Sequence, residues 1–295
     1  MIDQITIESE SRGTIEMVRG TRLGYYLDDV EFAKPDVNHN TYSYSNQVGA
    51  SIASTSVGER DITIRGYVLE IGQNTLQDRC DALNDYFSPL EDYTLHYKGW
   101  KMKFRPDGPI IWAREFKSNN MGGRSFMLQA TAAFPLFSKT ENTAVTFDSE
   151  EKLFHFPTSF GSDTPFAFSV TSEVYGVDVF NDGGADTGII GQITFTGSVT
   201  NPRLVNRTLG KYVGVNHTFA AGEVLEISTI SGDKHITLID SGGQTVNLMK
   251  KRDVGTTWWQ LIPGINAVSF TCEDVTEIGS MSVVLYYAPL RWEVE

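Results

Sequence analysis

The segment from Arg60 to Pro89 constrains the fold most, because it joins an alternating strand pattern directly to a helical one. From Arg60 to Val68, apolar residues and glycine alternate with polar residues, which is the period of a strand with one buried face. A helix is predicted over residues 74–87, where Thr75 offers a capping hydroxyl and Asp78 a negative charge near the N-terminal end. Pro89 ends the helix. Its apolar face is formed by Leu76, Cys80, Leu83 and Phe87.

A helix this short is marginal in isolation, since its first turn fixes several residues for one hydrogen bond. It must therefore lie on a sheet, where each large apolar side chain contributes roughly 1.5–3 kcal/mol on burial. Residues 1–137 are accordingly predicted to form a β domain sealed by one helix. The sequence Phe134-Pro135-Leu136-Phe137 ends this domain, because proline removes a ladder donor.

Residues 138–295 show no helical period of useful length, and their short apolar segments are separated by glycine-rich and asparagine-rich turns. This regular spacing predicts a second domain that is a β-sandwich or jelly roll. The fold class is therefore mainly β. Candidate strands are Ala144–Phe147, Phe166–Val170, Tyr175–Phe180, Ile189–Thr196, Val224–Thr229, His235–Ile239, Thr245–Leu248, Val268–Thr271 and Met281–Tyr287.

The charge balance bears on possible partners. The 295 residues carry a net charge of −13, and the acid excess is larger from Ser138 onward, with 19 acidic and 10 basic residues. Such a balance argues against a protein that grips nucleic acid, although an acidic wall lets DNA pass without sticking. Neither a membrane span nor a signal peptide is recognisable, which predicts folding in a cytoplasm without membrane insertion.

The stretch from Val37 to Asn46 is polar and rich in Asn, Ser and Tyr, and it includes Tyr42 and Tyr44. It is predicted to be a long exposed loop or arm before the Arg60 strand. Two readings stay open: contact with a neighbouring subunit, or a mobile surface loop.

No nucleophile elbow, phosphate loop or zinc motif is present, which predicts a protein without catalytic residues, cofactor or metal. The cysteines, Cys80 and Cys272, are predicted to be core residues rather than a disulfide. The oxygen-rich stretch Asp178–Asp186 is read as a glycine-rich turn, with a calcium site as the alternative. The histidines are His39, His96, His155, His217 and His235, and none has a close acidic partner in sequence.

Trp258 and Trp259 could offer an aromatic face to a sugar ring or to another protein. Adjacent residues of a strand point to opposite faces, so at most one of the two is exposed on a given surface. Aromatic burial explains the same residues.

Several sequence segments, taken in order, resemble those of one protein family. They are Glu59–Tyr67, Leu76–Pro89, Tyr93–Tyr97, Ala133–Phe137, Val179–Gly183, Ala221–Ile227 and Leu261–Asn266. Together they span nearly the whole chain, and they are similar to the distal tail proteins of bacteriophages with long non-contractile tails.

This resemblance implies an N-terminal domain of split-barrel type and a galectin-like C-terminal sandwich. It also implies a homo-oligomeric ring, usually a hexamer, around a channel through which DNA passes without specific binding. Such a ring joins the tail tube protein to the tail-associated hub or fibre protein, and in some phages it carries receptor-binding proteins. The expected location is the tail tip of the virion, after assembly in the host cytoplasm.

Two surfaces are candidates for the ring interface: the strand face with Arg65, Tyr67 and Leu69, and the loop with Tyr42 and Tyr44. The alternative hypothesis is a carbohydrate-binding sandwich that adheres to host envelope glycans through Trp258 or Trp259. A hydrolase whose site forms only in the folded chain ranks last.

Overall fold

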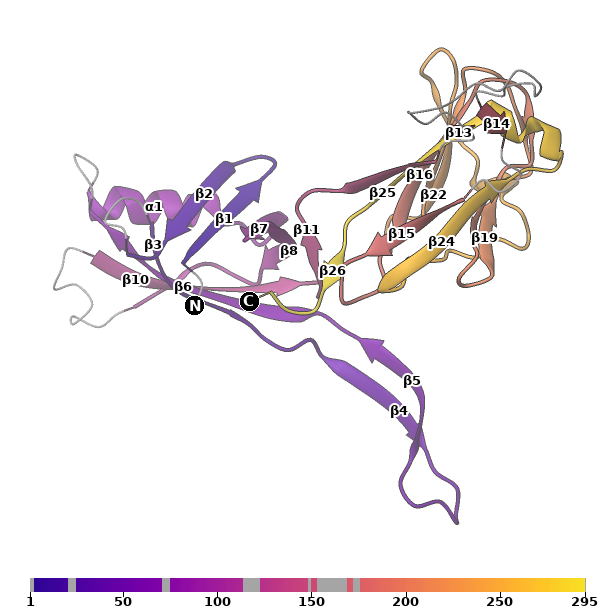
Figure 1. Ribbon diagram of the computed structural model, residues 1–295. Coiled ribbons are helices and arrows are strands. Elements are labelled where there is room, and N and C mark those ends of the chain that lie inside the picture. The colour runs from indigo at the N-terminus through magenta and orange to yellow at the C-terminus, as the bar shows by residue number, and fades with distance from the viewer. Residues whose placement is uncertain are drawn as a thin grey trace, which may run out of the picture. The chain divides into compact units, whose positions relative to one another are not determined.

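The computed structural model describes residues 3–20, 25–70, 75–113, 123–147, 150–152, 169–171 and 176–294. The chain divides into two compact units (Figure 1). The first contains residues 1–140 and 291–295, and the second contains residues 141–290. No helix in the described ranges is long and apolar enough to cross a bilayer.

The first unit is built on a closed barrel of seven strands, in which β8 pairs with β7 on one side and with β10 on the other. The barrel strands are β1 (Gln4–Ser9), β2 (Gly13–Val18), β3 (Tyr25–Phe32), β6 (Arg60–Leu69), β7 (Tyr93–Tyr97), β8 (Trp100–Pro106) and β10 (Gly123–Ala132). Three short strands extend it, namely β9 (Ile111–Trp112), β11 (Phe137–Lys139) and β26 (Leu290–Arg291). Closure removes the open edges that a flat sheet would expose.

The central strand β6 has the predicted alternation, with Ile62, Ile64 and Val68 buried in the barrel core. Gly66 also points inward, where a side chain would meet the carbonyl oxygen of Tyr26 and the ring of Phe126. Glycine is therefore required at this point of β6, because the β3 backbone and an aromatic ring already fill the space.

Helix α1 (Leu76–Tyr86) confirms the predicted helix and its N-terminal cap. The Thr75 hydroxyl accepts from the backbone of Asp78, whose carboxylate accepts from the backbone of Thr75, so two otherwise unpaired donors are satisfied. Leu83 is fully buried against the barrel core, together with Tyr86 at the end of the helix. The Tyr86 hydroxyl donates to the carbonyls of Ile7 and Gly13, and burial raises the pKa of Tyr86 to about 12.

The second unit is a sandwich of two antiparallel sheets, which confirms the predicted fold class. Six strands form one sheet: β12 (Thr143–Phe147), β25 (Met281–Tyr287), β16 (Ile189–Phe195), β21 (Val224–Ser228), β22 (His235–Ile239) and β23 (Thr245–Asn247). Four form the other: β15 (Gly176–Asn181), β24 (Gly264–Thr271), β18 (Arg203–Asn206) and β19 (Lys211–Gly214). The small pairs are β13 (Glu150–Lys152) with β14 (Ser169–Thr171), and β17 (Val199–Thr200) with β20 (Thr218–Phe219). Two 3-10 turns, η2 (Met249–Lys251) and η3 (Val275–Ser280), complete the described elements.

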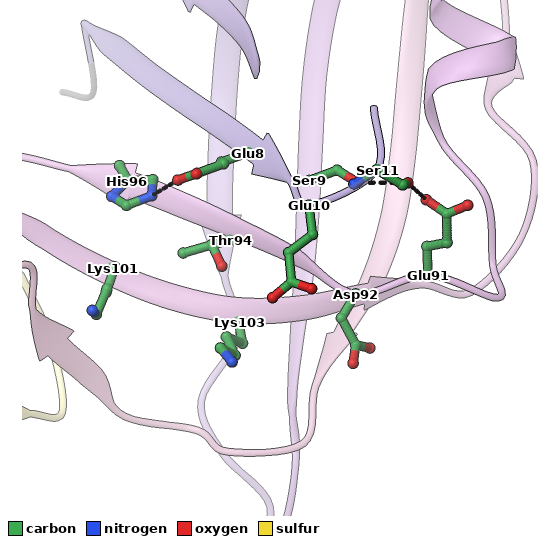
Figure 2. A pocket seen from close by; sticks show the side chains of 10 residues that line it. All are labelled: Glu8, Ser9, Glu10, Ser11, Glu91, Asp92, Thr94, His96, Lys101 and Lys103. Atoms are coloured by element: carbon green, nitrogen blue, oxygen red, sulfur yellow. Dashed lines mark hydrogen bonds and ion pairs between the residues drawn. The ribbon is translucent and has the colours of Figure 1, made fainter. Parts of the chain in front are cut away.

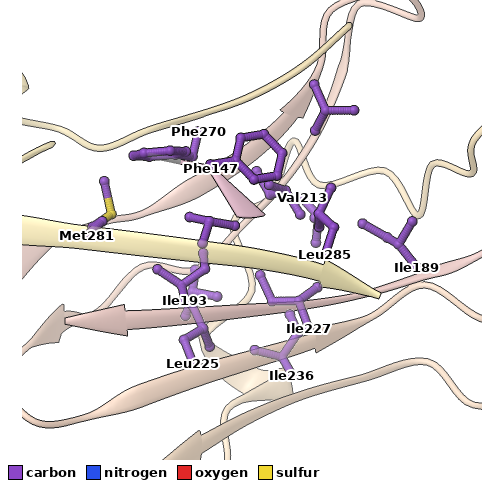
Figure 3. Close-up of a cluster of buried hydrophobic side chains, with 14 of the residues drawn as sticks. Phe147, Ile189, Ile193, Val213, Leu225, Ile227, Ile236, Phe270, Met281 and Leu285 are labelled. Carbon is purple, nitrogen blue, oxygen red and sulfur yellow. The ribbon is translucent and has the colours of Figure 1, made fainter. Parts of the chain in front are cut away.

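Apolar side chains from both sheets meet in one core (Figure 3). Ile193 and Leu225 come from the six-stranded sheet, while Leu204 and Phe270 come from the four-stranded sheet, and all four are buried. Inward residues alternate with outward ones along central strands such as β16 and β22, as a sandwich requires.

The structure differs from expectation at several points. Residues 291–294 follow the sandwich in the chain but belong to the first unit, because their contacts lie there. Residues 37–42, expected as a loop, form a strand. Outside the described residues lie His155, most of the predicted strand Phe166–Val170 and the first residue of the predicted strand Tyr175–Phe180.

Candidate functional site

The most exposed feature of the first unit is an arm of residues 37–57, formed by β4 (Val37–Tyr42) and β5 (Ser51–Val57) (Figure 1). It connects β3 to β6, which are paired neighbours in the barrel, and Figure 1 shows it running beyond the barrel strands. Every side chain from Val37 to Val57 is exposed except the half-buried Ser51. The arm contains no Asp, Glu, Lys or Arg.

The two faces of the arm differ. Cross-strand pairing places Val37 opposite Val57 and Thr41 opposite Ile52, on the face that also carries His39. Val37, Ile52 and Val57 are 43, 60 and 42% exposed, so this apolar face has no cover. The other face carries the pairs Asn38–Ser56, Asn40–Ser54 and Tyr42–Ser51.

The tip of the arm presents the two predicted tyrosines. Their rings meet edge to face with centroids 5.6 Å apart, and Tyr42 and Tyr44 are 47 and 71% exposed. An uncharged ribbon with free edges and aromatic residues is typical of a surface that another chain covers.

The strand face with Arg65 is largely engaged within its own chain. Arg65 forms ion pairs with Asp29 (3.7 Å) and Glu31 (3.3 Å) on β3. The Tyr67 ring lies edge to face against Tyr26, with centroids 5.7 Å apart. Leu69 is half-buried beside Gly123.

The same outer face of β3, β6 and β10 is acidic. Asp61 and Asp107 lie with Glu31 around a hollow of about 310 Å³. Arg65 is the one basic residue at the described outward positions of these three strands, and its ion pairs with Asp29 and Glu31 neutralise its charge. This face therefore repels polyanions.

A larger groove, of about 510 Å³, lies where β1 and its following turn face β7 and β8 (Figure 2). Its lining carries both negative and positive charges. The acidic residues are Glu8, Glu10, Glu91 and Asp92, and the basic ones are Lys101, Lys103 and His96. His96 pairs with Glu8 at 3.1 Å across β1 and β7. Hydrogen bonds from Arg12 and from Ser11 hold the pKa of Glu91 below its usual value. An open groove without aromatic walls suits contact with a protein surface better than with a small ligand.

The tryptophan pair lies in the irregular segment between η2 and β24 rather than in a strand, and its two rings have different environments. Trp259 is 2% exposed and donates from Nε1 to the carbonyl of Leu204, so it belongs to the sandwich core. Trp258 is half-buried, and the guanidinium of Arg252 lies 6.0 Å from the ring centre.

The oxygen-rich turn at Asp178–Asp186 is closed by its own hydrogen bonds. The amide of Asn181 donates to the carbonyls of Ala185 and Leu261, and its oxygen accepts from the backbone of Gly183. Within the described ranges, no cluster of three His, Cys, Asp or Glu side chains could hold a metal ion.

The expectation that no histidine has a close acidic partner in sequence is wrong at His235, which contacts Asp233 two positions away at 3.2 Å. Its other acidic partner comes from a neighbouring strand. His235 on β22 contacts Glu226 on β21 at 3.1 Å, and Gln192 donates to the same carboxylate. Burial lowers the pKa of His235, but hydrogen bonds to Glu226 and Asp233 outweigh it and leave the pKa raised. This arrangement is an ion pair on a sheet surface.

Both described thiols are free. Cys80 is buried, and burial raises its pKa. Burial chiefly, with Glu277 and Asp274 nearby, raises the pKa of Cys272 to about 11. Neither thiol is therefore an activated nucleophile at neutral pH.

Solved structures with a similar fold come from phage tails. The crystal structure of the phage SPP1 Dit protein, described as a paradigm of hub adsorption apparatus in phages that infect Gram-positive bacteria, aligns with a TM-score of 0.62. The identity is 13%, over 96% of this chain and 98% of that chain. A chain of the phage P2 baseplate in its activated conformation with Ca aligns with a TM-score of 0.55 at 11% identity, with full coverage of both chains. No curated protein sequence matches this chain.

Family models match the chain in two successive parts. Residues 20–158 match a phage tail protein RIFT-related domain, and residues 182–289 match the C-terminal domain of the siphovirus-type tail component. A chain whose barrel matches the first domain and whose sandwich matches the second has the organisation of a siphovirus-type tail component. The chain belongs to the distal tail proteins of siphoviruses, which are structural proteins of the tail tip and baseplate.

Proposed function

We propose that six copies of this chain close into a ring that forms the hub of the tail tip around the DNA channel. The exposed, charge-free arm carries this proposal. Its apolar face leaves three aliphatic side chains about half exposed, and covering each contributes about 1 kcal/mol. A neighbouring copy is the occupant proposed for this face, since a ring repeats one contact around its axis.

The arm is preferred to the Arg65 face as the ring contact. Arg65 and Tyr67 already have partners on β3, whereas the aliphatic side chains on the arm's apolar face remain about half exposed. Tyr42 and Tyr44 are proposed to extend the contact at the tip.

The acidic face of β3, β6 and β10 is proposed to line the channel. DNA phosphates would meet Asp29, Glu31 and Asp61, with Arg65 already neutralised, so DNA would slide past without binding. The ring would join the tail tube protein to the hub or fibre protein, with receptor-binding proteins at its side, and would assemble in the host cytoplasm. The role is structural and non-enzymatic.

Light scattering after size-exclusion chromatography, together with negative-stain imaging, tests the ring. We expect six chain masses and a central hole. Ile52→Lys should give monomers, because it places a charge in the apolar face. The matched control Ser54→Lys, on the other face of β5, should retain the ring. A wild-type protein that stays monomeric at high concentration would refute the proposal.

The carbohydrate-binding alternative gains no support from the tryptophan pair, because Trp259 is core and Trp258 lies under Arg252. A glycan array tests this alternative: glycan binding by the wild type that is lost in Trp258→Ala would support it.

A further inference from the structure

Arg60 occupies a junction of four chain segments in the first unit. It begins β6 directly after the arm, and it is 2% exposed. Its Nη2 donates to the backbone carbonyl of Trp292 at 2.8 Å, and its guanidinium carbon lies 5.5 Å from the ring centre of Phe137. The Phe137 ring in turn meets Phe32, the last residue of β3, edge to face with ring centroids 4.8 Å apart.

A buried cation needs partners, because removal from water is costly. Burial lowers the pKa of Arg60, whereas nearby Glu293 acts in the opposite direction. Nε of Arg60 has no hydrogen-bond partner among the described atoms. Most of the compensation therefore comes from residues 291–294, here called the return segment, which supply the Trp292 carbonyl and the Glu293 charge.

The return segment has its own anchors on the first unit. The guanidinium of Arg291 lies 4.7 Å from the ring centre of Trp100, and Val294 packs against the barrel core. Strand β26 also pairs with β11. The segment is thus held at both ends around the carbonyl that Arg60 uses.

The base of the arm is formed by three backbone hydrogen bonds next to Arg60. Ala33 donates to the carbonyl of Asp61 (2.9 Å), Asp36 to Glu59 (3.3 Å) and Gly58 to Asp36 (2.7 Å). Two of these acceptors, Glu59 and Asp61, flank Arg60 in sequence. A shift of Arg60 therefore moves both.

We propose that Arg60 is a positioning residue for the arm: the docked return segment holds Arg60 in place, and Arg60 orders the arm's base. A copy whose return segment is undocked has a loose arm and joins the ring poorly. This last consequence rests on the proposed ring function.

Hydrogen exchange followed by mass spectrometry on the full chain at a concentration that keeps it monomeric tests the proposal. The variants are Arg60→Met, a deletion of residues 292–295, and both together. We expect peptides containing Ala33, Asp36 and Gly58 to lose protection about tenfold in each single variant, while β1 and β7 stay unchanged. The double variant should lose no more than either single one, because both act through the same contact. Arg65→Met, an exposed arginine on the same strand, is the control and should leave the base unchanged.

Additive losses in the double variant, or unchanged exchange at the arm's base, would overturn the proposal. If Arg60→Met fails to fold, the deletion and Arg60→Lys decide the question. The deletion must lower the protection of the arm's base. Arg60→Lys keeps the positive charge and must therefore retain part of that protection. Ring formation is measured separately. A wild type that forms no ring would refute the hub function, whereas the exchange pattern would still decide the role of Arg60.

Discussion

Substituting Gly66 by alanine should destabilise the barrel, although alanine is otherwise tolerated in strands. An added Cβ would lie 2.8 Å from two ring carbons of Phe126 and would also meet the carbonyl oxygen of Tyr26. The ring can tilt, but the β3 backbone is held by its pairing to β6 and cannot retreat cheaply. Overpacking of this kind costs about 1–3 kcal/mol.

A matched control is available in the same unit. At Gly58 an added Cβ would meet only Asp36, at 3.4 and 3.5 Å, which is ordinary contact. Gly58→Ala should therefore be neutral, or stabilising by about 0.4–1 kcal/mol through the unfolded chain.

Differential scanning calorimetry of the two variants gives the answer. A loss of 1–3 kcal/mol corresponds to a melting temperature lower by roughly 3–10 °C for a unit of this size. Equal melting temperatures for Gly66→Ala and Gly58→Ala would refute the argument that close backbone approach requires glycine in β6.

Further predictions concern the helix, the thiols and the histidine pair. Leu83→Ala should cost about 3–5 kcal/mol in urea unfolding, because Leu83 is fully buried on the inner face of α1. Thr75→Ala should cost about 1 kcal/mol in the same assay, through loss of the cap. Cys272 should react with a disulfide reagent at pH 8 far more slowly in the folded protein than in urea, because its pKa is raised to about 11. His235 should contribute about 0.5 kcal/mol below its unfolded pKa of about 6.5. That contribution should be lost as pH rises through the raised folded pKa, and His235→Gln should remove this pH dependence.

Local patterns predicted the β6 strand and the helix well. The alternation in β6 and the Thr75–Asp78 cap depend only on residues close in sequence, so the sequence alone is enough to predict them. The two-domain, mainly β organisation followed in the same way from apolar periodicity.

The sequence predicted an exposed arm but not its two strands, because these strands lack the apolar alternation that a buried face would impose. Asn38, Asn40 and Ser54 are compatible with a loop as well as a strand, and pairing between β4 and β5 decides between them. The ion pairs Arg65–Glu31 and His235–Glu226 could not be predicted for a related reason, since each joins neighbouring strands. The contact between Arg60 and Trp292 joins residues 232 positions apart, which no local pattern reveals.

The placement of residues 291–294 in the first unit has a consequence for biosynthesis. A ribosome releases the N-terminal barrel strands and the whole sandwich before it releases these residues. The barrel unit therefore lacks residues 291–294 until the ribosome has passed the whole sandwich. Under the proposed role of Arg60, a nascent chain acquires an ordered arm only after its sandwich has been translated, so joining to sister chains on the polysome is disfavoured.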